Sequence, residues 1–313
     1  MAPPKMFVAR ELPVDAAARA GQGIDVRVFS EARAASREEI LQEARGAAAL
    51  VTTLSQRVDG DLLDALPTLR VVSNYAVGYD NIDVPACTAR GIWVGHTPDV
   101  LTDATADLAM ALLLAVARRL PEGEAMVRAG DFGGPWHPRK LLGMDLSGAT
   151  LGIVGMGRIG RAVAHRAKAF GMRILHSSRS SGLPLPELLA QADAVSLHCP
   201  LTEETHHLFD ASRFAEMKRG SILINTARGP IVDEGALVAA LEGGVLRGAG
   251  LDVYEREPAV HPGLVDRRDV VLLPHVGSAT EGARRGMAER AIDNAARVLR
   301  GEEPLSAVNR PRP

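Results

Sequence analysis

Short apolar runs alternate with amphipathic stretches in the first hundred residues of the chain. Helices are predicted between the runs, among them Ser36–Arg45, which opens with a Ser-x-x-Glu capping box, and Gly60–Leu66. Strands separated by helices indicate a parallel, doubly wound sheet. The apolar runs predicted as strands are Met6–Ala9, Ile24–Phe29, Ala48–Thr52, Arg70–Ser73 and Ile92–Val94.

A long apolar helix is predicted over Thr102–Leu120, with Asp103 near its start and Arg118-Arg119 near its end. Because it is apolar around much of its circumference, we expect it to be buried between domains or subunits. The stretch Gly130–Leu142 is rich in glycine and proline and is predicted to be irregular. Trp136 lies in this stretch, and an exposed tryptophan there would need a partner.

A second series of strands and helices begins at Thr150, and a final helix over Thr280–Arg300 is expected to return to the first domain. The fold class is therefore α/β, with two doubly wound parallel-sheet domains and the active site in the cleft between them. The predicted domains are residues 1–98 with 287–313, and residues 99–286. The predicted strands of the second series are Thr150–Val154, Arg173–His176, Ala194–Leu197, Ser221–Asn225, Gly248–Leu251 and Val270–Leu273.

The composition narrows the classes of function. The 313 residues carry a net charge of −2, so no basic excess points to nucleic acid or to an anionic membrane. The longest apolar run, Leu108–Val116, is much shorter than the ~20 residues that span a bilayer, and the N-terminus lacks the apolar core of a signal peptide. Cys87 and Cys199 indicate neither a disulfide framework nor a zinc site, so we expect a cytoplasmic protein.

The glycine-rich turn GMGRIG, residues 155–160, follows the predicted strand Thr150–Val154 and opens a helix. Backbone N–H groups and the helix dipole at such a turn favour a pyrophosphate, which indicates a dinucleotide site. A structural turn is the simpler alternative, and a methyltransferase can also carry a glycine-rich loop after a strand.

A second loop, Ser73–Asp80, also follows a predicted strand. Gly78 permits a backbone bend whose N–H groups could hold a small anion at the carboxyl edge of the sheet. The alternative is a plain turn. Leu54-Ser55 ends an earlier strand and could lie beside this loop.

Arg228, Glu257 and His275 follow three predicted strands of the second series. Each alone could be a surface or packing residue, but three ionisable groups at strand ends favour catalysis. A methyltransferase would leave the three without a role. His206 and His207 are adjacent, so we expect them to diverge, and with His198 they show no metal-ligand spacing; no metal site is predicted.

Six segments resemble the D-isomer-specific 2-hydroxyacid dehydrogenase family, and within it most closely the NADPH-dependent glyoxylate/hydroxypyruvate reductases. The resemblance implies a flavodoxin-like substrate domain, a Rossmann cofactor domain, a homodimer, and reduction of a short 2-oxo acid. The segments are SNYAVGYDNID, TPDVLTDATADL, GMGRIG, NTARGPIVDEGAL, GLDVYEREP and LLPHVGSAT.

The resemblance also implies catalysis by Arg228, Glu257 and His275, with the substrate carboxylate held by backbone around Val77-Gly78. His275 can donate a proton to the ketone oxygen, and the charge of Glu257 would favour the protonated ring. Arg228 can orient the carboxylate and polarise the carbonyl. The expected substrate-binding residues are Leu54, Ala76, Val77, Gly78, Arg228 and His275. The expected cofactor-binding residues are Thr105, Gly155, Gly157, Arg158, Ile159, Gly160, Ser177, Ser178, Arg179, Cys199, Pro200, Thr205, Thr226, Ala227, Arg228, Asp252, His275 and Gly277.

The loop after the second strand of the cofactor domain predicts the type of dinucleotide. Ser178 stands where NAD-binding domains carry an acid that binds the ribose 2′-hydroxyl, and Arg179 follows. Without the acid, a 2′-phosphate is accommodated, so NADP is predicted over NAD; a merely polar loop is the alternative. Two other functions stay open: an NAD-dependent dehydrogenase of a larger D-2-hydroxy acid, and a nucleotide-sensing interaction protein of the same fold.

Overall fold

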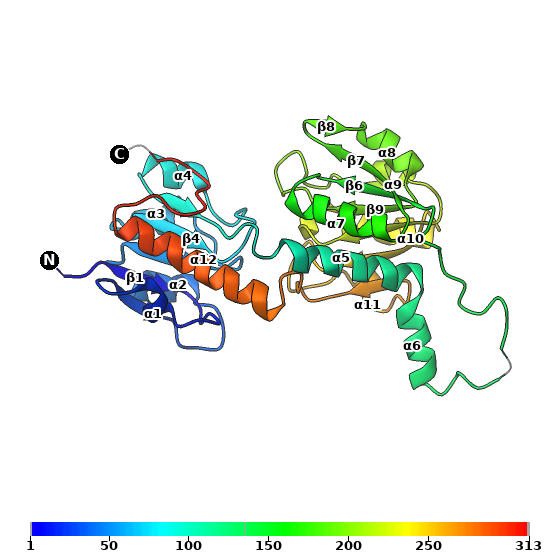
Figure 1. Cartoon of the computed structure of the whole chain (residues 1–313), viewed down its shortest axis with the longest axis horizontal. Helices are drawn as coiled ribbons and strands as arrows, with labels where there is room; N and C mark the ends of the chain where they lie inside the picture. The colour runs from blue at the N-terminus through cyan, green and yellow to red at the C-terminus, as the bar shows by residue number, and fades with distance from the viewer. Residues whose placement is uncertain (1, 135, 312–313) are drawn as a thin grey trace. The chain divides into compact units, whose positions relative to one another are not determined.

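The structure is a computed structural model that describes residues 2–134 and 136–311. The described chain forms two compact units. The first unit contains the residues up to Leu101 and those from Ala279 onward, and the second contains Thr102–Ser278. Figure 1 follows both along the chain from the blue N-terminus to the red C-terminus.

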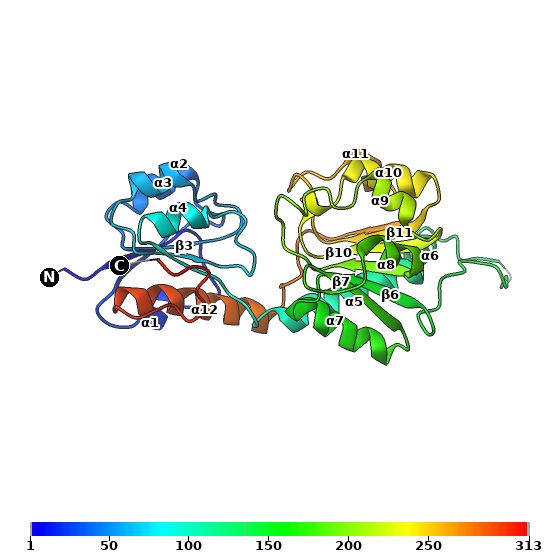
Figure 2. The ribbon, with the colours of Figure 1, turned by 90° about the horizontal axis from the view of Figure 1, so that it is seen from above.

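The first unit is built on a five-stranded parallel sheet in the order β2-β1-β3-β4-β5, the order of flavodoxin-like folds. Helices α2, α3 and α4 cover one face, and α1 and α12 cover the other (Figures 1 and 2). The strands are β1 (Lys5–Val8), β2 (Asp25–Val28), β3 (Ala49–Thr52), β4 (Val71–Asn74) and β5 (Trp93–Gly95). The helices are α1 (Ala16–Ala20), α2 (Arg37–Glu43), α3 (Gly60–Ala65), α4 (Val84–Ala89) and α12 (Glu281–Leu299).

The start of α2 confirms the predicted capping box. The Ser36 hydroxyl accepts from the Glu39 N–H at 3.3 Å, and the Glu39 carboxylate accepts from the Ser36 N–H at 2.7 Å. Two of the N–H groups that a helix start leaves unpaired are thereby satisfied.

The second unit is built on a seven-stranded sheet in the order β12-β11-β10-β9-β6-β7-β8. Helices α8 to α11 cover one face, and α5 and α7 cover the other (Figure 2). The strands are β6 (Thr150–Val154), β7 (Arg173–Ser178), β8 (Ser181–Gly182), β9 (Ala194–Leu197), β10 (Ser221–Asn225), β11 (Leu246–Leu251) and β12 (Val270–Leu272). The helices are α5 (Thr102–Ala117), α6 (Leu120–Arg128), α7 (Arg158–Ala169), α8 (Leu185–Gln191), α9 (Ala211–Glu216), η1 (Gly229–Ile231, a 3₁₀ turn), α10 (Glu234–Glu242) and α11 (Pro262–Val265).

The predicted parallel sheet of the second unit is confirmed, and a short strand that the sequence did not predict, β8, joins its edge antiparallel to β7. The chain reverses just after Ser178, whose hydroxyl donates to the Ser181 carbonyl at 2.9 Å. Gly182 has φ +96°, and a side chain there would clash with the His176 carbonyl. The short hairpin therefore depends on the conformational freedom of this glycine.

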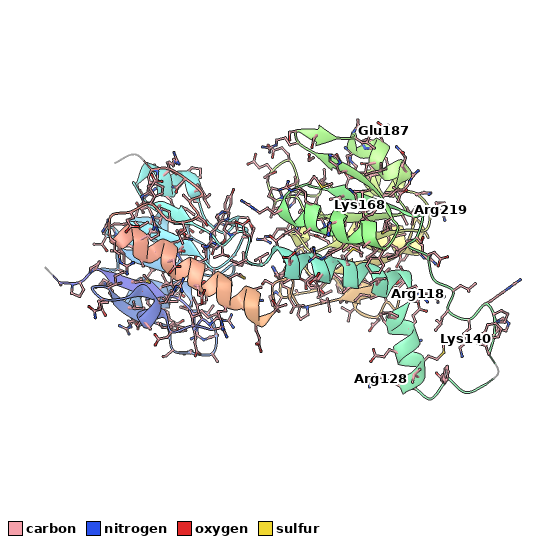
Figure 3. The ribbon with its side chains drawn as sticks, viewed as in Figure 1. Arg118, Arg128, Lys140, Lys168, Glu187 and Arg219 are labelled. Carbon is pink, nitrogen blue, oxygen red and sulfur yellow. The ribbon has the colours of Figure 1, made fainter. Side chains whose placement is uncertain are left out.

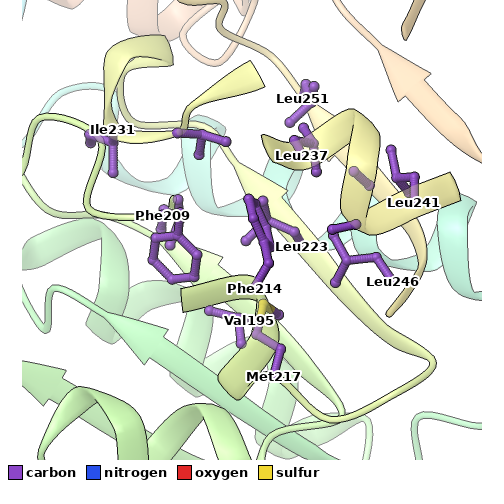
Figure 4. Close-up of a cluster of buried hydrophobic side chains, with 14 of the residues drawn as sticks. Val195, Phe209, Phe214, Met217, Leu223, Ile231, Leu237, Leu241, Leu246 and Leu251 are labelled. Carbon is purple, nitrogen blue, oxygen red and sulfur yellow. The ribbon is translucent and has the colours of Figure 1, made fainter. Parts of the chain in front are cut away.

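Apolar side chains from the sheet and from α9 and α10 fill the core beneath one face of the second unit (Figure 4). Phe209 and Phe214 meet edge to face, with ring centroids 6.0 Å apart, against Leu223 of β10 and Leu251 of β11. Charged residues such as Lys168 and Glu187 project outward from the helices of this unit (Figure 3). The strands that end at the site are thus held on a rigid apolar base.

The long apolar helix ends earlier than predicted, at Ala117 rather than Leu120. Pro121 has no N–H to donate to the Ala117 carbonyl, and that carbonyl accepts instead from the N–H of Met144 at 2.8 Å. Arg119 takes a left-handed conformation with φ +53°, and a new helix, α6, begins at Leu120.

The described residues of Gly130–Leu142 contain no helix or strand, as predicted, and Pro135 lies outside the described residues. Trp136 is 86% exposed. No helix among the described residues is long and apolar enough to cross a membrane.

The final helix α12 belongs wholly to the first unit, where it packs against β3, β4 and β5. The predicted boundary at 286/287 would cut through this helix, whereas the chain enters the first unit at Ala279, before the helix begins. A continuous helix packs as one rigid element, so the crossing falls in the loop that precedes it.

Candidate active site

The three glycines of the loop between β6 and α7 have different surroundings. A side chain at Gly155, which has φ +95°, would lie 2.5 Å from the Cys199 nitrogen, and one at Gly160 would clash with the Gly155 carbonyl. A side chain at Gly157 would meet no described atom within 4 Å. Gly155 and Gly160 are therefore needed for the turn and for close helix–strand packing, whereas the backbone at Gly157 faces open space.

The start of α7 fits the pyrophosphate of a dinucleotide. Gly157 is the N-cap residue, and no side chain caps the helix there. First-turn N–H groups thus lie beside the open space at Gly157, and the helix dipole favours an anion. The Thr226 hydroxyl follows β10, which lies two strands away from β6 in the same sheet; it is buried and has no hydrogen-bond partner among the described residues. A bound cofactor would supply hydrogen-bond partners for the first-turn N–H groups and for the Thr226 hydroxyl.

The predicted ribose loop lies at the end of β7, whose last residue is Ser178. The Arg179 side chain is 85% exposed, and its guanidinium lies 3.9 Å from the Glu204 carboxylate. Two other predicted cofactor residues are engaged in local contacts: Thr205 donates to the Pro200 carbonyl at 2.7 Å, and Thr105 donates to the Gly277 carbonyl at 3.2 Å. Burial raises the pKa of the Cys199 thiol to about 11, so it stays protonated.

The loop that carries Arg228 is shaped by Asn225, the last residue of β10. The Asn225 side chain accepts from the Ala227 N–H at 3.0 Å and donates to the Arg228 carbonyl at 2.9 Å. A side chain at Gly229 would clash with the backbone of Tyr254, because the loops after β10 and β11 touch here. Neither Gly229 nor Tyr254 was given a role from sequence, although both lie in the segments that carry the family resemblance.

The loop after β12, which carries His275, is held by Asp252 at the end of β11. The two carboxylate oxygens of Asp252 accept from the N–H groups of Val276 and Gly277, each at 2.7 Å. Burial raises the pKa of Asp252, and these two N–H groups partly counter that rise. His275 takes a left-handed conformation with φ +54°, which this grip on the next two residues supports.

Tyr254 ties the same loops together through its side chain. Its hydroxyl donates to the Leu273 carbonyl at 2.8 Å, and burial raises its pKa to about 12, so the donor proton is retained. The loop after β12 is therefore joined to the loop after β11 on both sides of His275.

Glu257 and His275 form a hydrogen-bonded pair: Nδ1 of His275 lies 2.8 Å from one oxygen of Glu257. The other oxygen accepts from the Tyr254 N–H at 3.1 Å. Burial raises the pKa of Glu257, but the bond to His275, the Tyr254 N–H and the charge of Arg228 together outweigh burial and leave this pKa below its usual value. The carboxylate is thus charged at neutral pH, and the structure brings the three predicted catalytic residues to one edge of the second sheet.

The predicted substrate loop of the first unit follows β4. The Asn81 side chain donates to the carbonyls of Thr53 and Gln56, at 3.1 and 2.9 Å, so the loop that contains Leu54 lies beside it, as expected. The Tyr75 N–H donates to the Thr52 carbonyl at 2.7 Å.

The expectation that His206 and His207 diverge is wrong, because their rings stack with centroids 4.1 Å apart. His207 has φ +49°, which turns its ring back over its neighbour, and its Nε2 lies 3.1 Å from the Glu255 carboxylate. Burial lowers the pKa of His198 to about 4, and its neutral ring bonds to the Ser196 hydroxyl at 2.8 Å. No group of three potential metal ligands occurs among the described residues.

Comparison with known proteins agrees with this geometry. The sequence profile of the D-isomer specific 2-hydroxyacid dehydrogenase NAD binding domain matches residues 110–277. A glyoxylate reductase from Thermococcus onnurineus (strain NA1) is 48% identical over 98% of this chain and 96% of its own length.

Two solved structures are similar over nearly the whole chain. A protein from Thermus thermophilus superposes with a TM-score of 0.92 at 48% identity, covering 97% of this chain and 100% of that one. The complex of an NADPH-dependent glyoxylate/hydroxypyruvate reductase from Sinorhizobium meliloti with NADP and malonate superposes with a TM-score of 0.84 at 33% identity, covering 99% of each chain.

The site geometry and the similarity lead to one assignment. The glycine loop and its sheet form a Rossmann domain for a nicotinamide cofactor, and Arg228, Glu257 and His275 lie at the carboxyl edge of that sheet. The chain therefore belongs to the D-isomer-specific 2-hydroxyacid dehydrogenase family and is an oxidoreductase of the glyoxylate reductase type.

Proposed function

We propose that the protein reduces glyoxylate, hydroxypyruvate or a similarly short 2-oxo acid to the D-2-hydroxy acid with NADPH, and that His275 donates the proton. Family membership gives the reduction of a 2-oxo acid. The short substrate is supported by the relatives that are named glyoxylate reductases.

The contact between His275 and Glu257, 2.8 Å long, is the observation that carries the proposed chemistry. The carboxylate faces Nδ1, so the ring can present Nε2 to a substrate. An imidazolium so oriented is a suitable general acid for an alkoxide that forms at a reduced ketone.

A nicotinamide cofactor, held by the glycine loop at the start of α7, would supply the hydride to the ketone carbon. In the proposed mechanism, His275 transfers its Nε2 proton to the ketone oxygen while Glu257 stabilises the charged ring. The Arg228 guanidinium stabilises the developing negative charge and orients the substrate carboxylate. Backbone N–H groups of Ala76, Val77 and Gly78 bind that carboxylate.

The preference for NADPH rests on the end of β7. The strand ends on a serine, Ser178, so no carboxylate from this position opposes a 2′-phosphate, and the next residue, Arg179, is highly exposed. A guanidinium and several hydroxyl groups suit a phosphate that carries close to two negative charges.

The test is one absorbance assay of cofactor oxidation. The purified protein is given NADPH or NADH with glyoxylate, hydroxypyruvate, phenylpyruvate and longer 2-oxo acids. We expect the highest kcat/KM with NADPH and a two- or three-carbon substrate. Turnover confined to long 2-oxo acids, or faster with NADH, contradicts the proposal.

We further propose a homodimer in the cytoplasm. Trp136, 86% exposed, offers apolar surface for a second copy, and Cys87 and Cys199 are both free thiols, which suits a reducing compartment. Light scattering at micromolar concentration tests the dimer; an active monomer would refute it.

A further inference from the structure

Three successive carbonyl groups in the loop after β4 are each bonded from within the first unit. The Ala76 carbonyl accepts from the Thr97 N–H at 2.8 Å, and the Gly78 carbonyl accepts from the Asn74 amide at 2.8 Å. The Val77 carbonyl lies between them in sequence and is 2.9 Å from Nδ1 of His96. All three carbonyls are thus directed toward the body of the unit.

The N–H groups of the same residues, Ala76, Val77 and Gly78, donate to no acceptor among the described residues. Val77 and Gly78 are partly exposed. A short row of N–H groups without protein acceptors is an anion-binding arrangement, and its orientation is fixed by where the carbonyls are held.

The bond from His96 to Val77 also defines the ring. A carbonyl oxygen can only accept, so Nδ1 of His96 must carry the hydrogen. The ring meets Tyr79 edge to face, with centroids 5.6 Å apart and planes at 82°. His96 therefore contacts the loop on both sides of Gly78.

The backbone of His96 is anchored by residues from the far end of the chain. Its carbonyl accepts from the buried Asn294 side chain at 2.9 Å, and its N–H donates to the Ser306 carbonyl at 3.1 Å. Asn294 also accepts from the Ser306 N–H at 3.0 Å. These bonds fix the backbone of His96 and so fix the position from which its imidazole donates to the Val77 carbonyl.

We infer that His96 is a positioning residue for the substrate carboxylate: by holding the Val77 carbonyl inward, it keeps the N–H groups of Ala76, Val77 and Gly78 turned toward the anion. This inference rests on the proposed function, because it takes the loop as the carboxylate site. Membership of the family does not by itself imply a role for His96. The one indication in the sequence is its position directly after β5, whose carboxyl end lies beside that of β4.

The test compares His96→Leu with His96→Asn. Leucine removes the donor, whereas the asparagine amide can occupy the place of Nδ1 and donate to the Val77 carbonyl. For His96→Leu we expect about a ten-fold or larger rise in KM for glyoxylate, with kcat and KM for NADPH within about three-fold of wild type. For His96→Asn we expect KM for glyoxylate near the wild-type value.

Binding of oxalate, a dicarboxylate that is not reduced, gives a second readout without turnover. Calorimetric titration of the NADPH-loaded protein is expected to show the same loss for His96→Leu and the same recovery for His96→Asn. His165→Leu is the matched control, because His165 is an exposed histidine on α7.

The outcomes separate the two proposals. If the wild-type protein reduces no short 2-oxo acid, the proposed function fails before any variant is compared. If it does so, and His96→Leu keeps wild-type KM and oxalate affinity, the role of His96 is refuted. Equal losses in both His96 variants would also refute it, because the donor would then not be what matters.

Discussion

Nδ1 of His275 lies 2.8 Å from a carboxylate oxygen of Glu257, and the second oxygen of Glu257 is held by the Tyr254 N–H. The carboxylate therefore cannot rotate away without losing a backbone bond. This fixes the ring plane of His275 and directs Nε2 away from Glu257, which is the geometry a proton donor needs.

Replacing His275 by alanine is expected to lower kcat for glyoxylate by about 10²–10⁴-fold, the usual range for loss of general acid catalysis. NADPH binding, measured by fluorescence, should be retained, because the glycine loop and Ser178 are untouched. Near-normal kcat in this variant would rule out His275 as the donor.

Replacing Glu257 by glutamine is expected to narrow the pH range of reduction. The pKa of Glu257 lies below its usual value, so its charge is present throughout the assay range and favours the protonated ring of His275. Glutamine removes that charge, and the rate should then begin to fall at a lower pH than in the wild type. A pH–rate profile of kcat/KM from mildly acidic to mildly alkaline pH measures this, and an unchanged alkaline limb would count against the pairing.

Two glycine variants separate cofactor binding from folding. Gly157→Ala adds a methyl group into space where no described atom lies within 4 Å, so we expect a normal melting temperature and weaker binding of both NADPH and NADH. Gly160→Ala drives the same methyl group into the Gly155 carbonyl, and we expect a loss of thermal stability. Thermal melts and cofactor titrations measure both effects. Cofactor binding by Gly157→Ala as tight as in the wild type would contradict the role of Gly157 at the pyrophosphate.

The loop after β7 is expected to bind the 2′-phosphate of NADPH. The pair between Arg179 and Glu204 is 3.9 Å long and exposed, so little is lost when Arg179 turns to a phosphate. Charge-assisted bonds contribute about 1.5–3 kcal/mol each, so Arg179→Ala should raise KM for NADPH roughly ten- to a hundred-fold and leave NADH nearly unchanged.

Ser178→Asp is the complementary change. Its carboxylate should repel the phosphate and accept from the ribose 2′-hydroxyl of NADH, which shifts the preference toward NADH while kcat at saturating cofactor holds. An equal rise in KM for NADPH and for NADH in Arg179→Ala would show that this loop does not recognise the 2′-phosphate.

Strands such as Thr150–Val154 could be predicted because they are short apolar runs that become buried on both faces; all five residues of this strand are buried. The end of α5 was missed although its signal was present. Pro121 removes one helical hydrogen bond, but two arginines and a leucine, all good helix formers, follow Ala117 and favour a longer helix. The hairpin of β8 was missed because a two-residue strand leaves no periodicity to read.

The site was predictable to the level of its reactive groups, because Arg228, Glu257 and His275 each follow a strand end. The contacts that fix them were not. Asp252 accepts from N–H groups that lie 24 and 25 residues later in the chain. The local sequence does not show which backbone groups a carboxylate will bind. Such pairings arise only when neighbouring strands bring their loops together.

Helix α12 completes the first unit from the far end of the chain: it packs against β3, β4 and β5, and its Ala291 carbonyl accepts from the Ser73 hydroxyl at 2.8 Å. During synthesis on the ribosome, one face of the first sheet is therefore covered by α1 alone until the whole second unit has been made. A nascent or truncated chain that stops before residue 281 can close the second unit but lacks α12 on this face. A chain that stops before residue 281 also lacks Asn294 and Ser306, so it cannot form the bonds that hold the His96 backbone.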